Sequence, residues 1–232
     1  MSGGAGRRAF WRFNWLARHK IADALERAAH HARGALLDIG CGAKPLAPVL
    51  AERVDRHWGV DLPGSRDLGP PGRGPEVFAR AESLPFRDAT FDTALGLSVL
   101  TYVPEPSRLL DEAHRVLKPG GMLLMEFTQM APLHPYLDDY FRFTRTGATW
   151  LLERSGFAVV EVIPIGGLMA RVGLSAIAAL NRVNRGPTRV LTEVPIRLLY
   201  VVLQLGFALL DAVFADPTEP LSHLVVARKQ RA

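Results

Sequence analysis

Residues 35–44 read Ala-Leu-Leu-Asp-Ile-Gly-Cys-Gly-Ala-Lys, a short apolar run that ends in an acidic residue and two glycines. A run of this kind is typical of a buried strand in a parallel sheet. Because glycine lacks a Cβ atom, Gly40 and Gly42 let the backbone turn sharply and let a ligand approach closely. A dinucleotide-binding fingerprint would need a further glycine at the position of Pro45. Asp38, two positions before the first glycine, instead fits a ligand that carries an amino group.

A second strand is expected at His57–Asp61, after a helix over Pro45–Arg53. Asp61 follows Gly42 by 19 residues, the spacing that a strand–helix–strand unit requires. A carboxylate at the end of this strand can accept hydrogen bonds from both hydroxyls of a ribose.

Strand and helix patterns alternate along the rest of the chain. Further strands are expected at 76–80, 91–97, 122–127, 157–163 and 222–228, and helices at 107–117 and 146–155. Turn residues at 118–121 and Gly156 end these two helices. The order predicts an α/β fold: a mostly parallel sheet covered by helices on both faces, with ligands at the carboxyl ends of the strands.

Composition permits one α/β domain with some length for an elaboration, since the chain has 232 residues and a net charge of +5. This charge permits an anionic partner without arguing for one. Cys41 is the single cysteine, so we expect no disulfide, no thiolate zinc site and no metal. The apolar run after Arg8 is broken by Arg12 and Arg18, so no signal peptide is expected. These features favour a cytoplasmic protein.

Three ordered motifs resemble those of class I S-adenosylmethionine-dependent methyltransferases, in the type 11 or UbiE-like branch. They are residues 36–46, the Ala-Glu-Ser-Leu-Pro-Phe and Ala-Thr-Phe-Asp stretch at 81–92, and Arg-Val-Leu-Lys-Pro-Gly-Gly at 115–121. Three motifs in order are more specific than one glycine pair. The resemblance implies a Rossmann-like fold of seven mostly parallel strands, with an antiparallel last strand, and S-adenosyl-L-methionine as the cofactor.

The resemblance also implies which residues bind the cofactor. Asp38, Gly40 and Gly42 would surround the methionine end, Asp61 would hold the ribose, Ala81 and Glu82 would border the adenine, and Leu97 and Ser98 would line the sulfonium. Two positions depart from the family. Arg80 stands where an Asp usually accepts the adenine amino group, and residues 98–102 read Ser-Val-Leu-Thr-Tyr where many relatives have His-x-x-Glu-His.

The segment 134–144 resembles a His…Asp-Tyr-Trp-Arg-Phe-Thr stretch found in enzymes associated with saccharide, lipid-linked or secondary-metabolite pathways. Methyl transfer to a hydroxyl needs a base as well as alignment, and the imidazole of His134 has a suitable intrinsic pKa. Asp139 would orient that imidazole or act as the base itself. Alternatively, Asp139 pairs with Arg142 or Arg145 and only fixes the loop, and His134 is structural.

An apolar helical insertion is expected between strands six and seven, because 58 residues separate Ile163 from Ser222. The chain therefore divides into an N-terminal helical segment (1–33), a cofactor-binding domain (34–164 and 220–232) and the insertion (165–219). Within the insertion, Arg197, Gln204 and Asp211 recur at seven-residue intervals, two helical turns, and so fall on one stripe, which Glu193 and Tyr200 extend.

Four interpretations of the insertion stay open. It is a lid over the acceptor pocket, a homodimer surface, a peripheral membrane contact, or a pair of helices packed on its own domain.

For the function, the sequence favours methyl transfer to a hydroxyl of a small-molecule acceptor. Nucleic-acid methylation is not expected, because the stretch after strand four lacks the Asn/Asp-Pro-Pro-aromatic signature of base-amine enzymes. Cys41 follows Gly40 rather than a proline, so it does not fit the nucleophile of a carbon-5 enzyme. The alternative from another class is a non-catalytic subunit that binds S-adenosylmethionine and docks through the apolar insertion.

Overall fold

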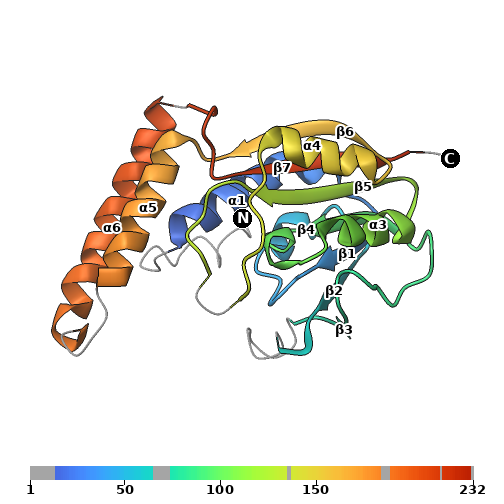
Figure 1. Cartoon of the computed structure of the whole chain (residues 1–232), viewed down its shortest axis with the longest axis horizontal. Coiled ribbons are helices and arrows are strands. Elements are labelled where there is room, and N and C mark those ends of the chain that lie inside the picture. Colours follow the sequence, from blue (N-terminus) through green and yellow to red (C-terminus); the bar gives the residue numbers. More distant parts are fainter. Residues whose placement is uncertain (1–13, 65–73, 135–136, 184–188, 215, 231–232) are drawn as a thin grey trace.

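The fold is built on a seven-stranded sheet with the strand order β3-β2-β1-β4-β5-β7-β6 (Figure 1). The computed structural model describes residues 14–64, 74–134, 137–183, 189–214 and 216–230. The strands are β1 (Ala35–Ile39), β2 (Arg56–Asp61), β3 (Val77–Phe78), β4 (Phe91–Gly96), β5 (Leu117–Thr128), β6 (Phe157–Ile165) and β7 (Ser222–Lys229). β7 runs antiparallel to β5 and β6, and the other pairs are parallel. The predicted α/β fold class is confirmed.

Helices cover both faces of this sheet. They are α1 (Trp15–Ala28), α2 (Ala47–Leu50), α3 (Pro106–Val116), α4 (Arg145–Arg154), α5 (Leu168–Val183) and α6 (Arg189–Phe214), with 3-10 turns η1 (Ala29–His31) and η3 (Leu100–Tyr102). α3 and α4 pack on one face of the sheet and α1 and α2 on the other. Successive residues of β1 point to opposite faces of the sheet. Leu37 belongs to the hydrophobic cluster on the α3 and α4 side, and Leu36 to the cluster on the α1 and α2 side.

Several element boundaries differ from the sequence prediction. The helix expected over Pro45–Arg53 is the four-residue α2, and the N-terminal helical segment predicted over residues 1–33 begins outside the described residues. β5 starts at Leu117 rather than Met122, since Leu117 pairs with Phe91 of β4. The Lys-Pro-Gly-Gly stretch therefore lies within this strand, although Gly120 has the positive φ of a turn residue.

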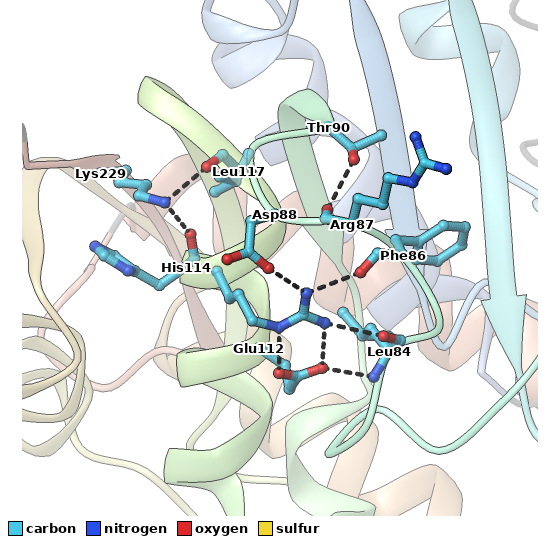
Figure 2. A network of polar contacts seen from close by, with 10 residues as sticks. Leu84, Phe86, Arg87, Asp88, Thr90, Glu112, His114, Leu117 and Lys229 are labelled. Carbon is cyan, nitrogen blue, oxygen red and sulfur yellow. Dashed lines mark hydrogen bonds and ion pairs between the residues drawn. The ribbon is translucent and has the colours of Figure 1, made fainter.

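Arg115, from the third motif, ties α3 to the segment that carries the second motif. Its guanidinium donates hydrogen bonds to the main-chain oxygens of Leu84 (2.9 Å) and Phe86 (2.8 Å) and to the carboxylates of Asp88 and Glu112. Glu112 in turn accepts from the Leu84 amide, as Figure 2 shows. These charged hydrogen bonds raise the pKa of Arg115. The two motifs thus form one structural unit that holds the loop after β3 in place.

The apolar insertion forms a helical hairpin of α5 and α6, which stands beside the sheet at the left of Figure 1. The two helices approach closely at Gly173, where a Cβ atom would lie 2.6 Å from Phe207. Both helices also contact α1. The described part of the hairpin is therefore joined to the domain through its N-terminal helix.

Candidate cofactor and acceptor site

The loop after β1 has the open, tightly turned backbone that the glycines predict. Gly40 and Gly42 have φ values of +71° and +50°, a region that side chains with a Cβ rarely adopt. A Cβ atom on Gly40 would lie 2.5 Å from the Val99 side chain, so this glycine permits contact with the loop after β4. A Cβ atom on Gly42 would meet nothing within 4 Å. One glycine thus packs the loop, and the other leaves its surface open to a ligand.

Asp61, at the carboxyl end of β2, holds this loop. Its Oδ2 accepts the Gly42 amide at 2.7 Å and its Oδ1 accepts the Leu62 amide at 2.7 Å. Each oxygen of a carboxylate can accept more than one hydrogen bond, so capacity for two ribose hydroxyls remains. The open surface over Gly42 and the carboxylate beside it fit an adenosyl group.

Asp38 lies buried beneath the loop. Its Oδ2 is 2.9 Å from Nε2 of His57, on the neighbouring strand. Burial raises the pKa of Asp38, although His57 and Lys44 oppose this shift. Sequence reasoning missed His57. The contact depends on the pairing of β1 with β2, because Asp38 pairs with Gly59 and side chains two residues apart on a strand, such as His57 and Gly59, share a face.

Lys44 and Glu76 form a second support that the sequence did not reveal. Nζ of Lys44 lies 2.6 Å from Oε1 of Glu76 and also donates to the main-chain oxygen of His57. Glu76 accepts the Gly59 amide at 2.6 Å. Burial opposes ionisation, but the hydrogen bonds from Lys44 and Gly59 prevail and lower the pKa of Glu76. The pair fastens the glycine loop to β2.

The expected adenine border lies in the turn after β3. Ala81 packs against the main core cluster, and the mostly buried carboxylate of Glu82 lies 2.7 Å from the guanidinium of Arg80. Arg80 itself is largely exposed. Where the family has an acidic residue, this chain therefore has a cation that is paired with the next acidic side chain.

The turn after β4 is held by a buried carboxylate. Ser98, with a φ of +54°, donates both its amide and its Oγ to Oε2 of Glu126 at 2.9 Å. The other oxygen of Glu126 accepts from Oγ of Ser222, at the start of β7. Burial raises the pKa of Glu126, while the hydrogen bonds from Ser222 and Ser98 lower it. Leu97 packs against the core on the α1 side of the sheet.

Glu126 was missed because it lies within the predicted strand Met122–Phe127. An acidic residue inside an apolar strand was the available signal, since such residues are rarely buried without partners. The predicted cofactor residues follow β1, β2, β3 and β4 and so gather at the carboxyl edge of the sheet. Their individual contacts with the cofactor stay predictions.

The expected acceptor loop lies at the same edge. The Tyr140 amide donates to the main-chain oxygen of Thr101, and the Phe143 amide to that of Thr128. The ring of His134 lies edge-to-face on the ring of Tyr102, with centroids 5.4 Å apart. Tyr102 occupies the last position of the family's His-x-x-Glu-His stretch, so an aromatic contact stands where many relatives have a histidine.

Asp139 makes contacts that differ from those of an imidazole-orienting residue. It forms a two-pronged ion pair with Arg142, and its Oδ2 accepts the main-chain amide of His134 at 3.2 Å. The ion pair, together with that amide, lowers the pKa of Asp139 although burial opposes the shift. A carboxylate with a lowered pKa is a weaker base. Of the alternatives, the contacts favour the one in which Asp139 pairs with Arg142 and fixes the loop.

No metal is expected at this edge of the sheet. Among the described residues, potential ligand atoms of His30, His31 and Glu161 lie within 4.8 Å of one another. His30 and His31 directly precede β1, so this group lies away from the glycine loop that follows the strand. It is therefore separate from the candidate site.

Comparisons with known proteins agree with this geometry. Residues 37–125 match the family model described as a methyltransferase domain. A protein of Mycolicibacterium smegmatis named as a probable S-adenosylmethionine-dependent methyltransferase is 28% identical over 175 residues, which cover 71% of this chain and 66% of that protein. A sterol 4-C-methyltransferase of Caenorhabditis elegans is 32% identical over 98 residues, or 38% of this chain and 29% of that protein.

Solved structures show the same fold. A methyltransferase from Thermotoga maritima superposes with a TM-score of 0.59 at 18% identity, covering 94% of each chain.

The chain spans about half the length of the curated relatives it matches, for example 45% of a methyltransferase of a Mycobacterium species. The fold is thus the one shared with class I S-adenosylmethionine-dependent methyltransferases, and the segment that carries the glycine loop matches a methyltransferase domain. This match implies S-adenosyl-L-methionine as the cofactor of the matched segment.

Proposed function

We propose that the protein transfers a methyl group from S-adenosyl-L-methionine to a hydroxyl of a small-molecule acceptor, from the saccharide, lipid-linked or secondary-metabolite classes. The observation that carries the proposal is the pairing of Asp61 with the Gly42 amide, at the open glycine loop between β1 and β2. The matched methyltransferase segment, which contains both residues, supports it.

Alignment is the main task of the residues at this edge. The cofactor, when bound, supplies an electrophilic methyl group on a sulfonium. Asp61 and the glycine loop would hold the nucleoside, while Glu126 fixes the turn of Ser98 that borders the reacting centre. Methyl transfer is an in-line displacement, and a held geometry removes much of the entropic cost of bringing two reactants together.

His134 would accept the proton of the acceptor hydroxyl. Its main chain is held by Asp139 and its ring by Tyr102, so the imidazole is positioned by two independent contacts. Burial, followed by the nearby charge of Asp139, raises the pKa of Tyr102, which keeps its hydroxyl protonated near neutral pH. His134 is therefore a better candidate for the base than either neighbour.

The exposed side chains of the acceptor loop support an acceptor with apolar character. Five large apolar or aromatic residues of the described loop are exposed: Met130, Leu133, Leu137, Tyr140 and Phe141. Exposed apolar groups at the entrance to a site favour a ligand that carries an apolar part. The sterol specificity named for one relative belongs to the same broad class of small molecules.

A non-catalytic subunit that binds S-adenosylmethionine is the second candidate. Arg80, paired with Glu82 at the adenine border, and the apolar exposed surface of α6 favour it. A partner enzyme would then supply the reacting groups. The two candidates differ in whether the purified chain turns over an acceptor on its own.

Calorimetry with S-adenosylhomocysteine tests the shared part of both candidates. Asp61→Ala removes the ribose acceptor and the tie to Gly42, so the affinity should fall by about 30-fold, equivalent to about 2 kcal/mol. Asp88→Ala, which removes an exposed partner of Arg115, is the matched control and should leave the affinity within about twofold. An unchanged affinity in Asp61→Ala would contradict the proposed site.

A methyl-transfer assay across hydroxyl-bearing acceptors then separates the two candidates. Turnover by the purified chain that weakens together with cofactor affinity in Asp61→Ala supports the enzyme. Tight binding of S-adenosylhomocysteine without turnover of any acceptor supports the non-catalytic subunit.

A further inference from the structure

α6 places apolar side chains on the outside of the molecule. The stretch Val194–Phe214 has a mean hydropathy of 1.8, yet only 17% of its most apolar window is buried. The exposed large residues of this helix are Val194, Leu198, Leu199, Val202, Leu205, Leu209, Leu210, Val213 and Phe214. We call these nine residues the α6 apolar face. An apolar core helix of a soluble protein would be mostly buried, so burial within the described chain does not account for this composition.

Two polar residues of α6, Gln204 and Asp211, are buried instead. Gln204 is fully buried, and its Oε1 accepts the Leu16 amide of α1 at 3.0 Å. Asp211 lies 2.6 Å from Nζ of Lys20, also in α1, and accepts the amides of Gly167 and Ala170 at the start of the hairpin. These two members of the predicted polar stripe thus attach the helix to its own domain, whereas Arg197 of the same stripe is exposed. The orientation of the apolar face is consequently set by specific polar bonds.

The helical hairpin as a whole carries an excess of positive charge. Residues 168–214 contain five arginines (Arg171, Arg182, Arg185, Arg189 and Arg197) and two acidic residues (Glu193 and Asp211), a net charge of +3 where the whole chain has +5. Apolar surface combined with arginines is typical of segments that bind anionic lipid surfaces. A second copy of this chain would bring the same positive charge against it, which disfavours self-association.

The hairpin leaves the sheet at the edge that carries the candidate site. β6 ends at Ile165, which pairs with Ser222 at the start of β7, and Ser222 also pairs with Thr128 at the end of β5. The amides of Gln129 and Met130, which begin the acceptor loop, donate to the main-chain oxygen of Leu221. In Figure 1 this loop runs between the hairpin and the sheet.

We propose that the α6 apolar face, together with the exposed Arg182 and Arg197, binds a membrane surface that contains anionic lipids. The contact is monotopic: the helix lies in the interface, because Gln204 and Asp211 are bonded to α1 and cannot also face lipid. The binding does not depend on the proposed methyl transfer. It would, however, place the entrance of the candidate site next to the lipid surface.

Sedimentation of the full chain with vesicles tests this proposal. Vesicles of phosphatidylcholine with phosphatidylglycerol should carry the protein down, and vesicles of phosphatidylcholine alone should carry down much less. Leu205→Glu combined with Leu209→Glu should lower the partition coefficient by more than about tenfold, because two exposed leucines no longer enter the interface. Arg182→Gln should lower the partition coefficient by about fivefold on anionic vesicles only. Raised salt should also lower the partition coefficient on these vesicles.

The matched control is Trp150→Glu, which replaces an exposed aromatic residue of α4. It should sediment as the unchanged protein does. Calorimetry with S-adenosylhomocysteine shows that each variant is folded, and because this binding involves no lipid, a failure of the membrane proposal is distinguishable from a failure of the proposed function.

Three results would overturn the proposal. One is partition that does not respond to anionic lipid or to the double leucine variant. Another is a dimer in analytical ultracentrifugation that the double leucine variant dissociates, since the face would then be a self-association surface. The third is membrane-bound protein that resists extraction by alkaline carbonate, which would indicate a spanning helix.

Discussion

The sheet and the α6 helix of this protein distribute polar and apolar residues in opposite ways. In the sheet, apolar residues of β1, β4 and β5 are buried and the buried carboxylate of Glu126 is an exception with dedicated hydrogen-bond partners. In α6, buried Gln204 and Asp211 form the attachment and leucines and valines face outward. The apolar residues of these strands are therefore covered by the described chain itself, whereas α6 leaves its apolar residues uncovered.

This difference shows that hydropathy alone does not decide which side of an element is the inside. The sheet obtains its stability from apolar burial, which is not directional. α6 is instead oriented by a few directional bonds to α1, which are costly to break once they are buried. Variants of the buried polar residues in α6 and in the sheet can test this contrast.

The largest effect is expected from Asp211→Ala. The change leaves Lys20 without its buried partner and leaves the amides of Gly167 and Ala170 without their acceptor. The free energy of unfolding should fall by about 3 kcal/mol, measured by thermal or urea denaturation. Asp23→Ala, at a partly exposed pair with His19, is the control and should change it by less than about 1 kcal/mol. Equal effects in both variants would contradict a bonded attachment of α6.

A smaller effect, confined to turnover, is expected from His134→Ala. Removing a general base should lower kcat by about 100-fold, with the affinity for S-adenosylhomocysteine unchanged. Tyr102→Phe keeps the ring against His134 and should retain most of the activity. A kcat in His134→Ala close to that of the unchanged enzyme would assign the imidazole a structural role.

The smallest effect is expected from Glu126→Gln and depends on pH. Burial raises the pKa of Glu126 above its ordinary value of 4.5, so the folded chain holds this proton more tightly than the unfolded chain does. The stability contributed by this group is present below pH 4.5 and is lost as the pH rises through the raised pKa. As the pH rises from acidic to neutral, the free energy of unfolding of Glu126→Gln should therefore increase relative to that of the unchanged protein by on the order of 1 kcal/mol. Parallel stability curves would contradict a raised pKa at this site.

Much of the fold and of the candidate site could be predicted because both depend on local patterns. The apolar run before Gly40, the position of Asp61 and the turn at Gly156 each lie within or next to one element. The extension of β5 back to Leu117 was missed because it depends on pairing with Phe91 of β4. His57, Lys44 and Glu126 were missed for the same reason, since their partners belong to other strands and loops.

The sequence by itself determined the α/β order of elements, the glycine loop with its distant carboxylate, and the existence of one polar stripe on α6, because periodicity and turn chemistry are local properties. Only the tertiary structure decided that Gln204 and Asp211 of this stripe are buried and that Asp139 forms a two-pronged ion pair with Arg142. The physical reason is that a hydrogen bond between Gln204 and Leu16 joins residues far apart in the chain, and such contacts exist only once the elements have packed.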